Sequence, residues 1–302
     1  MQEEKHIVKE KIVRLYDADL AQLKSALKEV SKLPNTKVEL YAKDKEYIVR
    51  LTIESGGVAA ATTLCDSAYE MIENAQPLQC YGSGNGTLAH VVAGVLITND
   101  TGLSAANIEL GEALETEFAT TRRGSEVYDN GERTYKRTNV QSKRIKAKEK
   151  TIDKYGENSL QAATDMAFAA CKAGKTKFGA ASTSADENGQ MWTVVTYGSK
   201  VYARQLNAYA STREMALAVL DLVRRIGRKE NVSESTRSFK KGKIHPECPS
   251  KKGASIIVPS IIALIIAAAL AFAIYYYYNI YNYVPNEITQ PVGTLISQEA
   301  KK

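Results

Sequence analysis

One long apolar run near the end of this 302-residue chain constrains its fold more than any other feature. No charged residue occurs between Lys252 and Glu287, and Ile256–Tyr278 is almost continuously apolar. A helix needs about 20 apolar residues to cross the hydrocarbon core of a bilayer. The run therefore predicts one transmembrane helix over residues 254–280. Its membrane residues would include Ile256, Leu264, Leu270 and Tyr275.

The charges on either side of this run predict its direction. Cytoplasmic flanks of membrane helices carry an excess of Lys and Arg. Six basic residues lie between positions 237 and 252, whereas only Lys301 and Lys302 follow the run. We therefore expect a single-pass protein of the cell membrane, with a cytoplasmic N-terminal domain and a short extracytoplasmic tail at 281–302. The charged start of the chain is not typical of a secretory signal peptide.

The overall composition limits the class of protein. With 44% hydrophobic and 25% charged residues, the chain is neither disordered nor fibrous. A mean hydropathy of −0.28 argues against several membrane spans. The four cysteines form no CxxC pair, so they predict neither a zinc site nor a disulfide framework. We expect no metal and no cofactor.

Residues 1–81 have the pattern of a small α/β domain. Lys11–Tyr16 alternates as a strand does, and Asp19 is placed to cap the helix that follows it. Lys37–Ala42 and Tyr47–Ile53 are β-rich runs that predict a hairpin, and a second helix is expected over Val58–Glu73. The glycine-rich segment 82–86 is interpreted as a linker because it lacks the spacing of a dinucleotide-binding loop.

Residues 87–228 predict a larger domain in which helices and strands alternate, which favours an α/β layered architecture. The segment Arg122–Lys154 reads as short strands and turns, and residues 229–253 read as a basic linker. The remaining expected elements are the helices Thr87–Ile97, Ala105–Thr120, Leu160–Ala173 and Arg213–Ile226, and the hairpin of Trp192–Tyr197 with Val201–Leu206.

The order of these pieces resembles the bacterial CinA family, competence/damage-inducible proteins whose C-terminal domain is a nicotinamide-nucleotide amidohydrolase. Residues 12–55 look like the middle domain of that family, and Tyr81-Gly82 before Thr87-Leu88 resembles its connection to the amidase-like domain. The stretch from Val127 to Tyr135 is similar to the segment before the family's active-site lysine. The resemblance covers residues 11–226 through scattered positions. It implies a middle-like domain at 1–81, an amidase-like domain at 87–228, and no molybdopterin-binding-like domain before them.

The sequence departs from that family at the catalytic positions. The family's signature Ala-Glu-Ser-Cys-Thr-Gly-Gly falls by spacing on residues 108–114, so Leu110 stands in place of the nucleophilic serine. A leucine side chain has no oxygen to attack an amide carbonyl. The family's lysine falls on Val140 unless an insertion brings Lys143 there. We therefore expect a pseudoenzyme with no catalytic residues.

Four residues could still line a remnant of the amidase pocket. A simpler interpretation, which we favour, makes Tyr135 a half-buried strand residue and Arg213 a surface arginine at a helix start. The four residues are Tyr135, Lys143, Thr183 and Arg213.

Three functions remain open on this basis. The first is non-catalytic binding or scaffolding at the inner membrane face, and the second is a nicotinamide-nucleotide amidase with a rearranged site. The third is binding of anionic lipid or nucleic acid through Arg122–Lys154, which holds 11 basic and 5 acidic residues. This segment has no recognisable nucleic-acid-binding module, so nucleic acid is not a favoured partner. The expected partners are a membrane, a second copy in a homodimer and a pyridine nucleotide. The basic surface would include Arg133, Lys136, Arg137, Lys143 and Arg144.

Overall fold

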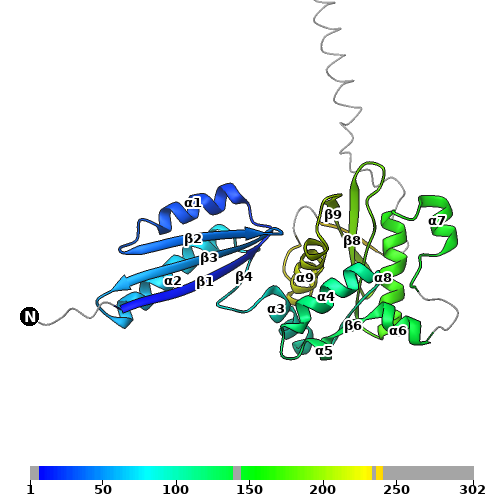
Figure 1. The fold of residues 1–302 in the computed structure, drawn as a ribbon, viewed down its shortest axis with the longest axis horizontal. Helices are drawn as coiled ribbons and strands as arrows, with labels where there is room; N and C mark the ends of the chain where they lie inside the picture. The colour runs from blue at the N-terminus through cyan, green and yellow to red at the C-terminus, as the bar shows by residue number, and fades with distance from the viewer. Residues whose placement is uncertain (1–6, 139–143, 233–235, 241–302) are drawn as a thin grey trace, which may run out of the picture. The chain divides into compact units, whose positions relative to one another are not determined.

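Two β-sheets organise the chain (Figure 1). The computed structural model describes residues 7–138, 144–232 and 236–240, and of residues 135–138 it describes the backbone alone. One sheet has four strands in the order β2-β3-β1-β4, and the other has six in the order β10-β9-β8-β7-β5-β6. All described residues fall in one compact unit, and the predicted domain boundaries stay a prediction.

The four-stranded sheet has the βαββαβ order of a ferredoxin-like unit, with antiparallel pairing between all neighbouring strands. Asp19 caps α1, because its Oδ1 accepts hydrogen bonds from the backbone N–H groups of Ala21 and Gln22 at 2.8 and 3.0 Å. The elements are β1 (Ile7–Tyr16), α1 (Leu20–Val30), β2 (Thr36–Lys43), β3 (Glu46–Ser55), α2 (Val58–Ala75) and β4 (Cys80–Ser83).

Both helices of this unit lie on one face of its sheet. Side chains alternate between the two faces of a strand, and in β3 the buried hydrophobic members are Val49, Leu51 and Ile53. They form one hydrophobic cluster with residues of β1, α1 and α2, including Leu23 and Ile72. The turn between β2 and β3 has a positive φ at Asp44 and Lys45 (52° and 62°), as a two-residue hairpin requires.

The six-stranded sheet is mixed. β6, β5 and β7 are parallel, and the pairs β7–β8, β8–β9 and β9–β10 are antiparallel. Its elements begin with α3 (Leu88–Thr98), β5 (Leu103–Ala105), α4 (Ile108–Ala119), α5 (Gly124–Val127), β6 (Tyr128–Asn130), α6 (Gly131–Thr138) and α7 (Glu149–Tyr155). They continue with α8 (Leu160–Gly174), β7 (Phe178–Ser182), β8 (Gln190–Tyr197), β9 (Lys200–Asn207), α9 (Thr212–Arg228) and β10 (Thr236–Lys240).

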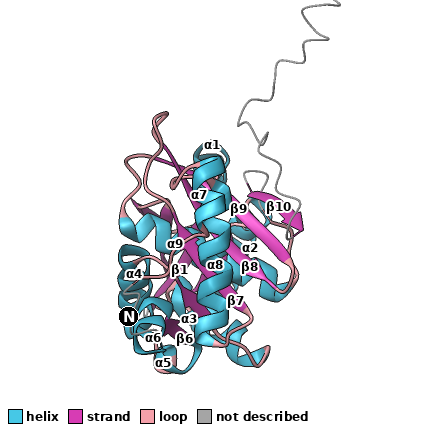
Figure 2. Ribbon diagram, turned by 90° about the vertical axis from the view of Figure 1, so that its right-hand side faces the viewer, coloured by secondary structure: helices cyan, strands magenta, loops and turns pink. Residues whose placement is uncertain are grey.

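Helices cover both faces of this second sheet. α8 lies in front of the sheet in Figure 2 and packs its alanines against Trp192, Val194 and Ala203. α3, α4 and α9 pack on the opposite face, where Val195 and Leu206 join their cluster. Helices on both faces of a partly parallel sheet define an α/β layered architecture, so this part of the predicted fold class is confirmed.

The secondary-structure prediction fails for the least regular segments. The sequence predicts strands and turns over Arg122–Lys154, but the described residues of this segment form α5, α6 and most of α7, with the three-residue β6 between α5 and α6. Tyr135 consequently lies in a helix and not in a strand. The short strands β4, β5, β7 and β10 were not predicted. Strand β7, for example, reads FGAAS and is buried on both faces, so it has no alternating pattern.

The predicted membrane anchor is the main correction. Among residues 7–138, 144–232 and 236–240, no helix is both long enough and apolar enough to cross a membrane. The longest of these helices, α2, carries three acidic residues in 18 positions, and charged side chains are costly inside a bilayer. We therefore withdraw the predicted transmembrane helix, the single-pass topology and the cell-membrane location. The span predicted at 254–280, with Ile256, Leu264, Leu270 and Tyr275, lies outside the described residues.

Candidate functional site

The parallel strands β6, β5 and β7 end at one edge of the six-stranded sheet. Open α/β sheets bind ligands in the crevice outside such carboxyl ends. Asn107 follows β5 and caps α4, because its Oδ1 accepts from the backbone N–H of Glu109 at 3.1 Å. Its φ of 77° is unusual for a residue other than glycine, and such conformations cluster at functional sites. We call Asn107, Glu132, Ser182 and Thr183 the carboxyl-edge site.

Glu132 occupies the centre of the carboxyl-edge site. This residue is 7% exposed, and its carboxylate accepts hydrogen bonds from the backbone N–H of Asn107 at 3.1 Å and of Ile145 at 3.0 Å. Ile145 is itself buried and packs in one cluster with Ala106. A carboxylate held by N–H groups at this edge takes the place that an anionic ligand would take. The chain's own groups therefore satisfy this part of the site.

The two hydroxyl groups of the carboxyl-edge site have structural partners. The Nδ2 group of Asn107 donates to the hydroxyl oxygen and to the backbone oxygen of Ser182, both at 3.4 Å. The Oγ1 atom of Thr183 accepts from the backbone N–H of Trp192 at 2.9 Å. A serine or threonine nucleophile needs a neighbouring base, and in the described part of the chain neither hydroxyl bonds to a basic side chain.

The first three residues of α4 carry no hydroxyl group. Leu110, which was predicted to replace the family's serine, is fully buried and packs in the core between α4 and the sheet. The first residue of α4 is Ile108, which is 41% exposed. If the family's serine corresponds instead to the first residue of α4, Ile108 stands in its place. Ile108 and Leu110 are both apolar.

A hollow of about 390 Å³ lies beside this edge, between α4, α5 and β6. We call it the α4–β6 hollow. Arg133 lies on its rim, where its Nη1 atom is 2.7 Å from Oε1 of Glu115. Asp129 and Asn130 supply further polar groups, and Phe118 supplies an apolar wall. The size and the mixture of apolar and polar lining are those of small-molecule sites.

One aromatic pair gives this hollow a fixed wall. The rings of Phe118 and Tyr128 are stacked with their centroids 5.1 Å apart. The hydroxyl of Tyr128 donates to the backbone oxygen of Gly111 at 2.8 Å. Burial raises the pKa of Tyr128 well above its ordinary value, so the phenol stays neutral at physiological pH.

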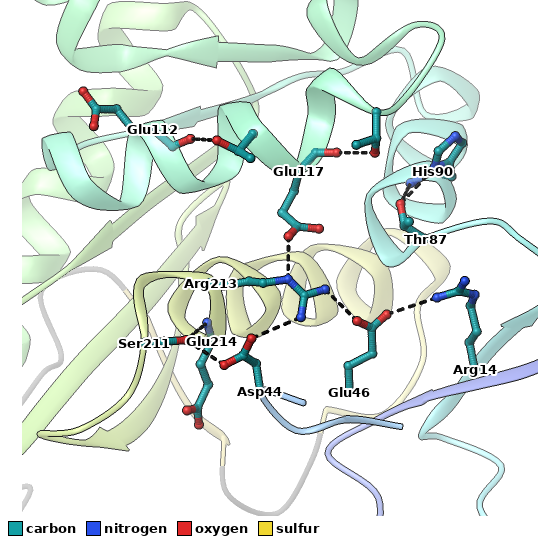
Figure 3. Close-up of polar contacts among 12 residues, drawn as sticks. Arg14, Asp44, Glu46, Thr87, His90, Glu112, Glu117, Ser211, Arg213 and Glu214 are labelled. Atoms are coloured by element: carbon teal, nitrogen blue, oxygen red, sulfur yellow. Dashed lines mark hydrogen bonds and ion pairs between the residues drawn. The ribbon is translucent and has the colours of Figure 1, made fainter. Parts of the chain in front are cut away.

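Arg213, a predicted site residue, lies in the first turn of α9 as expected but has a structural role (Figure 3). Its guanidinium contacts Glu46 at 2.6 Å, Glu117 at 2.9 Å and Asp44 at 3.2 Å. We call these four residues the Arg213 cluster. It joins the β2–β3 turn to α4 and α9. Arg14 lies on the other side of Glu46, at 3.6 Å.

The remaining predicted residues are dispersed. Thr183 is buried at the end of β7, whereas Arg213 contacts the β2–β3 turn, and Tyr135 belongs to α6. Lys143 lies outside the described residues. Of the predicted basic surface, Arg133 pairs with Glu115, Arg144 is exposed, and Lys136 and Arg137 lie in α6 without described side chains. No group of three or more metal-binding side chains occurs in the described part.

Sequence reasoning missed the residues that build the carboxyl-edge site. Glu132 lies within a strongly basic stretch, so it was counted there as one acid among many cations. Asn107 had a usable signal, since asparagine directly before an apolar helical run is a typical N-cap. Recognition of that cap would have started the helix at Ile108 and left Leu103–Ala105 free to form a strand.

Curated relatives match about half of the chain. A competence-damage inducible protein of Clostridium novyi (strain NT) is 31% identical over 149 residues, which are 49% of this chain and 36% of the relative. A competence-damage inducible protein of Clostridium botulinum (strain Loch Maree / Type A3) is 27% identical over 179 residues, 58% of this chain and 43% of the relative. The chain thus spans less than half the length of these relatives. No protein-family profile matches it.

Solved structures of similar proteins cover a similar share. A CinA superfamily protein from Enterobacter cloacae has 15% sequence identity and a TM-score of 0.36, with 49% of this chain and 95% of that chain covered. The competence damage-inducible protein A from Klebsiella pneumoniae has 14% identity and a TM-score of 0.37, with 47% and 94% covered.

The fold and the site define a two-sheet α/β protein with a candidate crevice at the carboxyl ends of its parallel strands. The sequence matches add a likeness to a family. Over about half of its length the chain is similar to competence-damage inducible proteins, in agreement with the resemblance to the CinA family.

Proposed function

We propose that this chain is a non-catalytic CinA-like binding protein, and that the α4–β6 hollow binds a pyridine nucleotide. The observation that carries this proposal is the combination of a polar hollow with a carboxyl-edge site that has no activated nucleophile. The choice of ligand follows from the family resemblance, which implies a nicotinamide nucleotide as the molecule recognised.

The arrangement of the carboxyl-edge site supports a role without catalysis. Amide hydrolysis through a covalent intermediate requires an activated hydroxyl or thiol close to the substrate. Ile108 and Leu110 at the start of α4 are apolar, and Glu132 and Ile145 lie next to this helix start. Ser182 and Thr183 use their hydroxyl oxygens as acceptors for groups of the chain itself.

The lining of the α4–β6 hollow supports binding of a phosphorylated ring compound. Arginine recognises phosphate through charge-assisted hydrogen bonds, and Arg133 presents its guanidinium at the rim with 63% of the side chain exposed. Asn130 offers an amide that can bond to ribose or carboxamide groups. Phe118 and Tyr128 form the apolar wall against which a ring can pack.

The test measures thermal stability and hydrolysis with the purified full chain. Nicotinamide mononucleotide at 100 times its dissociation constant should stabilise the protein by about 2.7 kcal/mol, and no ammonia should be released. Nicotinamide riboside lacks the phosphate and should stabilise it less. The Arg133→Gln variant should lose most of the stabilisation. Arg123→Gln is the matched control, because Arg123 is also an exposed arginine paired with a glutamate, Glu126.

Three results would contradict parts of this proposal. An unchanged melting temperature with the mononucleotide would show that the chain does not bind this ligand. Equal effects of Arg133→Gln and Arg123→Gln would show that the ligand does not bind in the α4–β6 hollow. Release of ammonia at enzymatic rates would support a rearranged amidase instead, and substitution of Tyr135 and Lys143 would then show whether those residues carry it.

A further inference from the structure

A second hollow, of about 490 Å³, lies at the opposite end of α9 from Arg213. We call it the α9-end hollow. The turn between β8 and β9 forms one side, and the residues that follow α9 form the other. It shares no residue with the α4–β6 hollow, so the inference below does not rest on the proposed function.

Two tyrosines and two aliphatic side chains form the wall of this hollow. Tyr197 is 38% exposed, and its ring is stacked on Phe178 with the centroids 4.5 Å apart. Tyr202 is half-buried on the neighbouring strand. Ile226 and Val232 add apolar surface that continues into the core. A wall of this kind accepts a flat ring, because aromatic rings pack well against each other and against aliphatic groups.

The rim of the α9-end hollow carries cations without partners in the described part of the chain. Lys200 and Lys229 line the hollow and are exposed, and neither forms an ion pair with a described residue. Glu230 also lines it, but its carboxylate lies 2.8 Å from Nη1 of Arg224 and 3.5 Å from Nη1 of Arg228. The single acid at the rim is therefore already neutralised.

The layer beneath the hollow adds to this positive charge. Asp221 is fully buried and contacts three arginines that are themselves 1–2% exposed. Two of them also hold the floor of the hollow, since Arg224 binds Glu230 and Arg225 donates to the backbone oxygen of Asn231 at 3.2 Å. Around the end of α9, four arginines thus share two carboxylates. The arginines are Arg204, Arg224, Arg225 and Arg228.

We propose that the α9-end hollow is a binding site for a small molecule that combines an anionic group with an aromatic ring. Lys200 and Lys229 bind the anionic group, and the ring packs against Tyr197 and Tyr202. Neither feature suffices alone, because an exposed lysine pair attracts any anion weakly and an open aromatic wall does not select among apolar compounds.

Phenyl phosphate, phenol and inorganic phosphate test this proposal with the full chain by isothermal titration calorimetry. Phenyl phosphate carries both features and should bind the tightest of the three. The double variant Lys200→Gln, Lys229→Gln should weaken phenyl phosphate binding by about tenfold or more and leave phenol binding unchanged. Lys24→Gln is the matched control. Lys24 is exposed on α1 and does not line the α9-end hollow, so this variant should leave all affinities unchanged.

The outcomes separate cleanly. Absence of phenyl phosphate binding would overturn the site. Equal affinity for phenyl phosphate and inorganic phosphate would show that the ring does not contribute to binding. Equal affinity of the double variant and the wild type for phenyl phosphate would show that the two lysines do not bind the anionic group. A loss in Arg133→Gln but not in the double variant would assign the binding to the α4–β6 hollow and overturn the inference.

Discussion

Two charge clusters on helix α9 mirror each other. In the Arg213 cluster one arginine meets three carboxylates. About two turns further along α9, the Asp221 cluster places one carboxylate among three arginines. The Arg213 side chain is 33% exposed, whereas Asp221 is 0% exposed and its arginines are 1–2% exposed. The same chemistry thus occurs once around a partly exposed arginine, whose three carboxylates are 7–15% exposed, and once fully in the core.

This difference in burial indicates that the fold depends more on the Asp221 cluster than on the Arg213 cluster. Water compensates a broken ion pair at a surface, but a buried charge that loses its partner keeps its full desolvation cost. Arg204 also lies over the ring of Tyr16, with 5.7 Å from the guanidinium carbon to the ring centroid. The Nη2 group of Arg224 donates to the backbone oxygen of Leu78 at 2.7 Å. The Asp221 cluster therefore stabilises contacts between both sheets.

The largest expected effect is that of Asp221→Asn. The variant keeps the shape of the side chain but leaves three buried arginines without their shared carboxylate. We expect the free energy of unfolding to fall by about 3–5 kcal/mol, measured by urea denaturation at pH 7. Asp153→Asn is the control, because Asp153 is exposed on α7, and its loss should stay below about 0.5 kcal/mol. Equal stability of the two variants would show that the fold does not depend on the Asp221 carboxylate.

A smaller effect is expected for Arg213→Gln. The variant leaves Asp44, Glu46 and Glu117 without their common cation, although Arg14 still faces Glu46. We expect a loss of about 1–3 kcal/mol in the same denaturation experiment. Lys45→Gln removes the neighbouring exposed pair with Glu214 and should cost less than about 1 kcal/mol. A loss in Arg213→Gln that is no larger than in Lys45→Gln would contradict the joining role of Arg213.

The smallest expected effect depends on pH. Burial alone would raise the pKa of Asp221, but Arg204, Arg224 and Arg225 outweigh it and hold the pKa below its ordinary value. A carboxyl with a lowered pKa contributes stability above its unfolded pKa, about 4, and this contribution is lost as the pH falls further. The stability difference between wild type and Arg225→Met should therefore shrink below about pH 4, by at most about 1.4 kcal/mol per pH unit.

Arg228→Met is the control for the pH dependence. Arg228 lies on the same helix but is 41% exposed and contacts Glu230 instead of Asp221. Its stability difference from wild type should not follow the titration of Asp221. A constant difference for Arg225→Met between pH 7 and pH 3 would show that Asp221 does not titrate against these arginines.

The elements with strong local signals were predictable from the sequence. Asp19 and Ser159 precede regular apolar spacing and do cap α1 and α8. The β8–β9 hairpin forms around Gly198-Ser199 as expected. Strand β7 was not predictable, because a strand buried on both faces shows neither alternation nor helical spacing. The resemblance to the CinA family depends in part on the order of these elements.

The candidate site was less predictable because it depends on distant pairing. Glu132 and Asn107 are 25 positions apart and meet only because β5 and β6 are neighbours in the sheet. Arg213 was correctly placed at a helix start, but its partners Asp44 and Glu46 lie more than 160 positions away. No pattern within a local window of sequence contains such pairs.

The separation between Asp44 and α9 also sets an interval during synthesis. The hydroxyl of Ser211 donates to Asp44 at 2.9 Å, and the two residues are 167 positions apart. A ribosome adds about 5–20 residues each second, so the β2–β3 hairpin emerges on the order of ten seconds before α9. Throughout that interval Asp44 and Glu46 lack Arg213, and of their two arginine partners only Arg14, which contacts Glu46, has been made. The acidic β2–β3 turn therefore meets Arg213 only after synthesis of α9.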